Sequence, residues 1–312
     1  MRSERNRTVI VGDDEMPLLL EKCLTADCLP DTIPEDTIVN ADIFEAVKRI
    51  PKKSIDLLIA DPPYNLAKQF GGNKFGAMSD EKYREYTACW LDAVMPLMKP
   101  TASIYVCCDW RSGYAVYNEL SERAMIRNRI TWQREKGRGA AKNWKNGMED
   151  IWFATVSDDY TFNLDAVRQR RRVLAPYKTG GKPKDWSETP SGKFRDTCPS
   201  NFWDDISVPY WSMPENTEHP TQKPEKLIAK LILASSDKDD VILDLFSGSG
   251  TASVTAKKLG RHYIGIEKEP RFCAAAQKRL FLAETDREIQ GYVDGVFWER
   301  NTASLQRSRK EV

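Results

Sequence analysis

The chain has 312 residues, of which 41% are hydrophobic and 30% charged, and its mean hydropathy of −0.56 indicates a soluble protein. This length accommodates one large α/β domain or a domain with a sizeable insert. No segment reaches the roughly 18 apolar residues that a membrane helix requires. The basic start of the chain is not followed by a signal-peptide core. We therefore expect a cytoplasmic protein with no membrane partner.

The cysteines and histidines give little support for a metal site. The seven cysteines are scattered, none forms a CxxC pair, and His219 and His262 supply the imidazoles. This pattern disfavours a structural zinc site, and two histidines give little support to a histidine-dependent triad. We predict reduced cysteines and no metal.

Charge is distributed unevenly along the chain although the net charge is only +1. Residues 127–195 contain 16 Lys/Arg against 8 Asp/Glu, and the remainder is mildly acidic. A basic block of this kind is typical of a surface that meets nucleic-acid phosphates. A solvated charged face would give the same pattern, so both interpretations stay open here.

Apolar runs and helical periodicity divide the chain into five parts. Residues 1–36 form an irregular N-terminal extension, and residues 37–164 alternate between strands and helices. We expect strands over 37–42, 55–60, 103–108, 126–132 and 151–156, and a helix capped by Ser79 that runs through Tyr83 to Val94.

The second half of the chain begins with a different pattern. Residues 165–218 are rich in arginine, proline and aromatic residues, and we interpret them as an inserted, loop-rich recognition segment. Regular patterning returns over 219–285, and 286–312 form a polar tail. The alternation on either side of the insert predicts a mostly parallel, doubly wound α/β sheet.

One short motif follows the apolar run 55–60. Asp61-Pro62-Pro63-Tyr64 places a carboxylate, two ring-locked residues and an aromatic ring at the end of a strand. The prolines hold the backbone extended and leave its carbonyl oxygens free as acceptors. Such a rim suits a flat ligand that offers an amino group, although any strand could end in this way.

A second motif has the plan of a nucleoside-cofactor pocket. A strand over 241–246 leads to the turn Ser247-Gly248-Ser249-Gly250, then to a helix and to a strand that ends at Glu267. The spacing from Gly248 to Glu267 suits a carboxylate that binds ribose hydroxyls. Ser253 replaces the third glycine of dinucleotide-binding turns, and no phosphate-binding lysine follows. An adenosyl sulfonium therefore fits, with Asp244 and the turn near its amino-acid part.

These motifs resemble those of amino-methylating DNA methyltransferases. Asp61-Pro62-Pro63-Tyr64 is similar to the catalytic motif of that family, and Phe246-Ser247-Gly248-Ser249-Gly250 to its FxGxG cofactor motif. His219-Pro220-Thr221-Gln222-Lys223-Pro224 is similar to the segment that precedes the cofactor motif in the β group. The order of the motifs also resembles that circularly permuted group, and the likeness spans roughly residues 37–283.

The resemblance implies a Rossmann-like, circularly permuted methyltransferase sheet, S-adenosylmethionine as cofactor and double-stranded DNA as substrate. The aspartate at position 61 favours N6 of a flipped-out adenine. Asp61 and the Pro62 carbonyl would accept the hydrogens of the amine, and Tyr64 would stack on the base. A cognate restriction endonuclease and a homodimer are the protein partners that the resemblance implies.

The resemblance also assigns site residues. The catalytic residues are Asp61, Pro62, Pro63 and Tyr64. The cofactor-binding residues are Asp42, His219, Thr221, Lys223, Asp244, Phe246, Ser247, Gly248, Gly250, Thr251 and Glu267. Most of the insert falls outside the resemblance, and the expected DNA contacts follow from its basic side chains instead: Arg168, Arg170, Arg171, Arg172, Lys178, Lys182 and Lys184.

Three alternatives remain at this point. The nearest is methylation of cytosine N4 or of an RNA base. A nicotinamide-dependent oxidoreductase would use a similar glycine turn but leaves Asp61-Pro62-Pro63-Tyr64 unexplained. A binding module without chemistry would not require Asp61, Tyr64 and Glu267 together.

Overall fold

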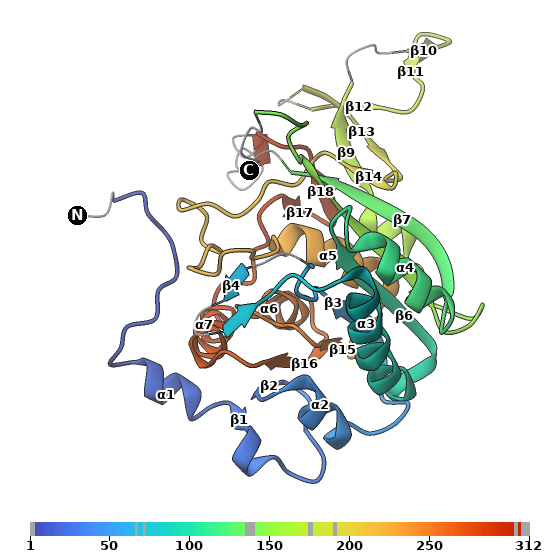
Figure 1. Ribbon diagram of the computed structural model, residues 1–312. Helices are drawn as coiled ribbons and strands as arrows, with labels where there is room; N and C mark the ends of the chain where they lie inside the picture. The colour runs from blue at the N-terminus through green and yellow to red at the C-terminus, as the bar shows by residue number, and fades with distance from the viewer. Residues whose placement is uncertain are drawn as a thin grey trace.

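The body of the molecule is a nine-stranded sheet with helices on both faces (Figure 1). The structure, a computed structural model, describes residues 4–65, 68–70, 73–134, 141–173, 177–189, 192–302 and 305–306. In spatial order the strands are β1 (Leu24–Thr25), β2 (Thr37–Asn40), β16 (His262–Glu267), β15 (Val241–Asp244), β3 (Ile55–Ala60), β6 (Met98–Cys108), β8 (Met148–Thr155), β7 (Met125–Gln133) and β14 (Phe202–Trp203).

Within this sheet every strand except β8 runs in the same direction. β15 and β16 come late in the chain but lie in the middle of the sheet, between β2 and β3. The predicted mostly parallel, circularly permuted sheet is therefore confirmed. Its central strands are apolar because helices cover both faces.

Helices cover the two faces of the sheet in two groups. One face carries α2 (Ile43–Ala46), α3 (Asp80–Val94) and α4 (Gly113–Ser121), and the other carries α5 (Glu225–Ser235), α6 (Thr251–Lys258) and α7 (Pro270–Leu282). Side chains of β3 alternate between these two cores, since Leu58 packs with α3 whereas Leu57 and Ile59 pack with α5 and α6. The expected cap of α3 is present, because the Ser79 hydroxyl oxygen accepts the Lys82 N–H at 3.3 Å.

The insert and the C-terminal tail together build a second sheet, which we call the recognition sheet. Its order is β12 (Ser187–Thr189), β13 (Gly192–Thr197), β9 (Gln169–Arg172), β18 (Val296–Trp298) and β17 (Tyr292–Val293). β18 lies parallel to β9, and Figure 1 shows the red tail beside the yellow-green insert. The expectation of a loop-rich insert was wrong for these strands. The insert strand β9 pairs with β18 of the distant tail, and the local sequence pattern does not reveal such long-range pairing.

The remaining elements are short. Two antiparallel pairs join β4 (Lys68–Phe70) to β5 (Asn73–Phe75) and β10 (Lys178–Thr179) to β11 (Lys182–Pro183). The other helices are α1 (Met16–Leu20) and the 3₁₀ turns η1 (Ala26–Cys28), η2 (Val47–Arg49), η3 (Met95–Leu97) and η4 (Leu164–Val167). In the described part of the chain, no helix has the length and apolar character needed to cross a bilayer.

Candidate active site

A cavity of about 350 Å³ lies where the carboxyl ends of β2, β3, β15 and β16 meet. Because these strands are parallel and adjacent, their ends converge on one edge of the sheet, where α/β folds bind ligands. The predicted residues that line it are Asp42, Asp61, Pro62, Pro63, Tyr64, His219, Thr221, Lys223, Phe246, Gly248 and Glu267. Both motifs therefore face one space, although almost 190 positions separate them in the sequence.

Asp61 lies at the centre of a dense polar network. The Tyr64 hydroxyl donates to Asp61 Oδ1 at 2.9 Å, and the Lys223 ammonium donates to Asp61 Oδ2 at 2.6 Å and to the Tyr64 oxygen at 3.1 Å. Tyr83 on α3 donates to the Pro63 carbonyl at 3.1 Å. The motif is thus fixed from both sides of the sheet.

Sequence reasoning missed Glu149, the second carboxylate of this network. Glu149 Oε2 lies 3.3 Å from the Lys223 ammonium and 3.3 Å from the Tyr64 hydroxyl, and Arg134 pairs with Glu149 Oε1. β8 runs antiparallel to β6, so the amino end of β8 lies at the same edge as Asp61. Only the sheet register places Glu149 there, and no local motif marks it.

Burial and neighbouring charge shift the ionisation of this network. Burial lowers the pKa of Lys223, but Asp61 and Glu149 outweigh it, so the net pKa lies above the ordinary value. Burial, followed by Asp61 and Glu149, raises the pKa of Tyr64 well above its usual range. Lys223 is therefore a cation and Tyr64 a neutral hydroxyl at physiological pH.

The glycine turn forms the opposite wall of the cavity. Gly248 has φ +50°, and a Cβ added there would lie 2.9 Å from the His219 Nε2 atom. The Gly248 N–H donates to Glu267 Oε2 at 2.8 Å, and the Glu269 N–H donates to Oε1 at 2.7 Å. Burial raises the pKa of Glu267. The carboxylate is thus held at the mouth of the turn, where a ribose would approach.

Four predicted cofactor residues lie behind this wall rather than on it: Asp244, Ser247, Gly250 and Thr251. Asp244 Oδ1 accepts the Phe246 N–H at 3.1 Å, and burial raises the Asp244 pKa to about 8. Gly250 begins α6 at φ +76°, and Thr251 accepts a hydrogen bond from Arg279 at 3.0 Å. The contacts of these four residues therefore support the glycine turn on the side away from the cavity.

Asp42, one of the expected cofactor-binding residues, lies on the third wall of the cavity. Its Oδ1 atom caps α2 by accepting the Phe44 N–H at 3.0 Å, and Lys268 lies 3.2 Å from Oδ2. Three aromatic side chains that the sequence reasoning did not select also line the cavity: Phe44, Tyr86 and Phe272. They give the space the flat, apolar walls that a heteroaromatic ring requires.

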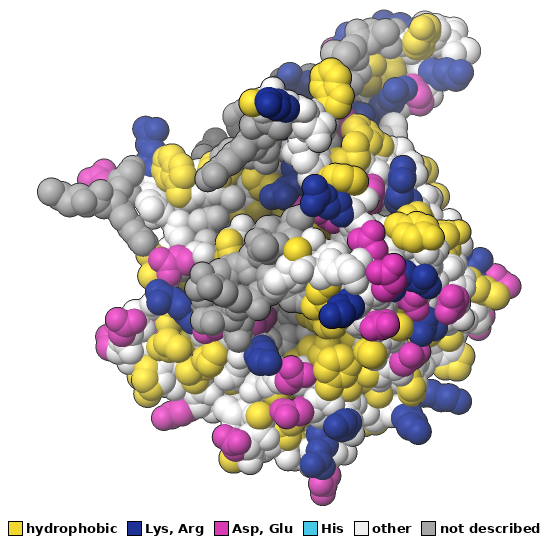
Figure 2. Space-filling view, viewed as in Figure 1, with side chains coloured by type: hydrophobic (Ala, Val, Ile, Leu, Met, Phe, Trp, Pro, Cys, Tyr) yellow, Lys and Arg dark blue, Asp and Glu magenta, His cyan; other side chains and the backbone are white. Residues whose placement is uncertain are grey.

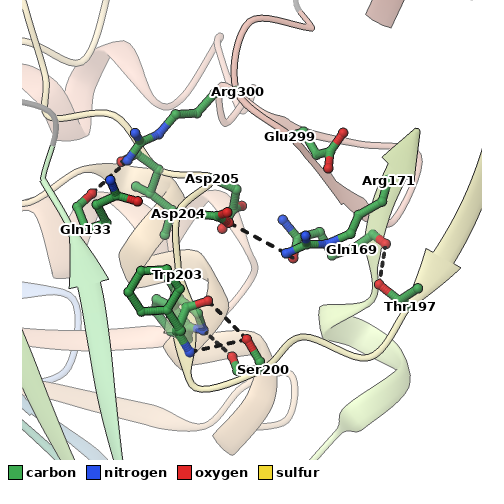
Figure 3. Close-up of polar contacts among 12 residues, drawn as sticks. Gln133, Gln169, Arg171, Thr197, Ser200, Trp203, Asp204, Asp205, Glu299 and Arg300 are labelled. Carbon is green, nitrogen blue, oxygen red and sulfur yellow. Dashed lines mark hydrogen bonds and ion pairs between the residues drawn. The ribbon is translucent and has the colours of Figure 1, made fainter. Parts of the chain in front are cut away.

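The predicted DNA contacts lie on and beside the recognition sheet, over which Figure 2 shows many dark-blue side chains. Arg168 pairs with Asp165 at 2.8 Å, and Arg170 is held by both oxygens of Asp196. Arg171 points toward Asp204 at 3.6 Å (Figure 3). The side chains of the other four are exposed: Arg172, Lys178, Lys182 and Lys184.

The C-terminal tail also touches the catalytic sheet. Arg300 donates to the carbonyl oxygens of Gln133 at 2.7 Å and Ile206 at 2.6 Å, and Figure 3 shows it lying across Gln133. Gln133 ends β7, next to Arg134 of the Asp61 network. The tail therefore bridges the recognition sheet and the edge of the catalytic sheet.

Comparisons with known proteins agree with this geometry. A family model described as DNA methylase matches residues 55–278. The chain is 31% identical over 261 residues to the type II methyltransferase M.HpaI of Haemophilus parainfluenzae, covering 83% of this chain and 76% of that protein. It is 32% identical over 252 residues to the DNA adenine methyltransferase YhdJ of Escherichia coli (strain K12), covering 79% and 83%.

A solved structure supports the fold. A crystal structure of an M1.HpyAVI–SAM complex superimposes with a TM-score of 0.54 at 24% identity, covering 78% of this chain and 98% of that one. The family model spans both the Asp61 motif and the glycine turn, and the two relatives exceed 30% identity over most of the chain. The chain therefore belongs to the DNA methylase family.

Proposed function

We propose that this DNA methyltransferase transfers a methyl group from S-adenosylmethionine to the N6 amino group of an adenine that has been flipped out of double-stranded DNA. The single observation that carries the proposal is the cavity that Asp61–Tyr64 and Gly248–Glu267 share. An amine and a methyl donor bound on its two sides would meet inside it. Holding both reactants in one crevice supplies much of a transfer enzyme's rate enhancement.

The residues of the glycine wall fit the methyl donor. Gly248 leaves room that a Cβ would fill, and the fixed Glu267 carboxylate suits two ribose hydroxyls. Asp42 and the aromatic walls suit an adenine ring, and Phe246 with the turn suits the amino-acid part. When bound, S-adenosylmethionine supplies an electrophilic methyl group. The similar M1.HpyAVI structure is a SAM complex, which supports this choice of cofactor.

The chain's own residues prepare the nucleophile. The lone pair of an exocyclic amine is conjugated into the base, so the amine attacks poorly until its hydrogens are accepted by fixed oxygens. Asp61 Oδ1 and the Pro62 carbonyl would accept them, which favours a tetrahedral nitrogen with its lone pair free. Tyr64 lines the same cavity and would stack on the base, which offsets part of the few kcal/mol that flipping costs.

The choice of adenine rests on two observations. Position 61 is aspartate rather than serine, which favours N6-adenine by analogy with the family. The relative YhdJ, 32% identical, is named a DNA adenine methyltransferase. The recognition sheet with its exposed basic side chains would read the surrounding sequence.

The proposal extends to location and partners. We place the protein in the cytoplasm, where unmethylated DNA is accessible, and pair it with a restriction endonuclease, as the likeness to a type II methyltransferase supports. Exposed aromatic side chains around α4 support a homodimer: Trp110, Tyr114 and Tyr117 are 62%, 70% and 40% exposed. Light scattering on the purified protein tests the assembly directly.

The function is tested by incubating the protein with isotope-labelled S-adenosylmethionine and DNA from a host that lacks methyltransferases. The DNA is then digested to nucleosides and analysed by mass spectrometry. Label in N6-methyldeoxyadenosine is the expected result. Label in N4-methyldeoxycytidine would show that the target base is cytosine and not adenine. No label in either nucleoside would overturn the proposal.

An Asp61→Ala variant is the control for the mechanism. It should bind S-adenosylmethionine normally and transfer no measurable methyl, because the donor wall is intact and the acceptor oxygen is lost. Full activity of this variant would remove Asp61 from the catalytic role.

A further inference from the structure

We propose that Lys223 is a positioning residue that acts through Asp61: it balances the charge of the carboxylate, holds one of its oxygens and leaves the other directed at the target amine. The inference rests on the proposed function and deepens it. The sequence placed Lys223 among the cofactor residues, whereas its contacts are with the acceptor side of the cavity.

The two oxygens of Asp61 have different partners. Oδ2 is held at 2.6 Å by Lys223, and Oδ1 is held at 2.9 Å by the Tyr64 hydroxyl. Each carboxylate oxygen can accept about two hydrogen bonds, so the amine hydrogen would go to the oxygen whose present partner is the more easily displaced. Lys223 is 8% exposed and pinned between two carboxylates, so its contact is the more permanent one. Oδ1 is therefore the oxygen that receives the amine.

Tyr64 has an alternative partner when it releases Oδ1. Its hydroxyl already lies 3.3 Å from Glu149 Oε2. A small rotation toward Glu149 would leave the hydroxyl satisfied while it frees the Asp61 oxygen. Glu149 is itself tied to Arg134, so it remains in place as the receiving group.

The charges in this buried network balance. Asp61 and Glu149 face Lys223 and Arg134, which gives two anions and two cations. Without Lys223, the two carboxylates would keep Arg134, on Glu149, as their one cation, and Asp61 would keep only the Tyr64 hydroxyl. The remaining excess of negative charge would favour uptake of a proton by one of the two carboxylates. A protonated Asp61 is a weak acceptor for the amine hydrogens.

The other titratable groups around Asp61 would not replace the lysine. Cys107 on β6 faces the site, and burial followed by Asp61 raises its pKa well above the usual range, so it stays neutral. Asp244 on β15 adds only a further acid. Among the described residues that face Asp61, Lys223 is thus the cation in direct contact with its carboxylate.

The test compares Lys223→Met and Lys223→Arg with wild type by measuring kcat against pH and the Kd for S-adenosylmethionine by calorimetry. In Lys223→Met, the acid limb of the kcat–pH profile should shift upward by about one unit, so kcat falls by up to about tenfold on the acid side and recovers with rising pH. Lys223→Arg keeps the charge and should keep the wild-type limb. The Kd should change less than about twofold in both variants, because the donor wall is untouched.

A double variant provides the sharper check. Lys223→Met/Glu149→Gln removes the second carboxylate, so its acid limb should move back toward wild type. The matched control is Lys99→Met, which removes a lysine–aspartate pair of 2.7 Å from the opposite, amino end of β3. It should leave the kcat–pH profile unchanged, and melting curves verify that each variant is folded.

Two outcomes would overturn the inference. The first is a Lys223→Met enzyme with a wild-type pH profile and a weakened Kd, which would return Lys223 to cofactor binding. The second is an equal shift of the acid limb in Lys223→Met and Lys223→Arg. If the wild-type enzyme methylates adenine, either outcome leaves the proposed function intact. A wild type that transfers no methyl would instead overturn that function.

Discussion

Arg279 on α7 and Glu225 on α5 form an ion pair of 2.9 Å with side chains only 3% and 4% exposed. The same guanidinium donates to the Ser249 carbonyl at 2.8 Å and to the Thr251 hydroxyl at 3.0 Å. One side chain thus ties the glycine turn to the start of α5, directly after the Lys223 segment. The pair therefore fixes the spacing between the glycine turn, which would hold the methyl donor, and Lys223 on the acceptor side of the cavity.

Arg279→Met should destabilise the protein and weaken cofactor binding. The change removes the buried partner of Glu225 Oε1, while Lys258 still holds Oε2 at 2.8 Å, and we expect it to cost about 1.5–3 kcal/mol of unfolding free energy. Urea unfolding and calorimetry with S-adenosylmethionine measure the two effects. Arg271→Met is the control on the same helix, because its pair with Glu218 is half exposed and should contribute under about 1 kcal/mol. Equal losses in the two variants would contradict this account.

Gly248→Ala should abolish tight binding of the methyl donor. The added Cβ would lie 2.9 Å from His219 Nε2 at φ +50°, so the turn must shift, and we expect the Kd to rise at least about tenfold. Gly295→Ala has a similar φ of +74° but meets no atom within 4 Å. It should cost about 1–2 kcal/mol of stability and leave the Kd unchanged. A normal Kd for Gly248→Ala would place the donor elsewhere.

His219 should make stability fall in mild acid. Burial, followed by Lys223 and Arg279, lowers its pKa to about 4, whereas the unfolded chain titrates near 6.5. The unfolded state therefore binds more protons in this window, and the contribution of His219 is lost as the pH falls from about 6.5 to 4. The full loss amounts to about 3 kcal/mol.

The measurement is the difference between the unfolding free energies of wild type and His219→Gln across that pH range. The difference should shrink as the pH falls. Asp244 and Glu215, whose pKa values burial raises to about 8 and about 7, contribute slopes of opposite sign in both proteins and cancel. A pH-independent difference would show that His219 is not held neutral.

Arg172 and Arg170, two residues apart on β9, should behave differently when each is changed to alanine. Arg170 is bound by both Asp196 oxygens at 2.6 and 2.7 Å and lies over the Trp298 ring at 5.3 Å, so its loss should cost about 1.5–3 kcal/mol of stability. Arg172 is exposed, so its loss should change stability by less than about 0.5 kcal/mol. Arg172→Ala should weaken DNA binding. It should also reduce by about one the slope of the logarithm of the binding constant against the logarithm of the salt concentration.

Fluorescence anisotropy with a DNA duplex over a range of KCl concentrations, paired with thermal melts, separates these two roles. An Arg172→Ala protein with unchanged affinity and salt slope would remove this strand edge from the DNA contact surface.

Local chemistry made much of the fold and the two motifs predictable. The apolar runs before Asp61 and before Gly248 mark buried strands because strands covered on both faces contain few polar residues. The glycine turn and the capped helix at Ser79 follow from backbone preferences of single residues. The family resemblance also rested on short, contiguous segments, which a sequence displays directly.

Tertiary structure alone decided how these parts meet. Glu149 belongs to no motif, and it reaches the partners of Asp61, Lys223 and Tyr64, because β8 runs antiparallel in register with β6. Lys223 lies 162 positions from Asp61, and the tail strand β18 pairs with β9 of the insert. The apolar pattern of the sequence indicates which residues are buried, but not which distant strand or charged side chain lies beside them. Those pairings depend on packing of the whole sheet, so the charge balance around Asp61 appears only in the folded protein.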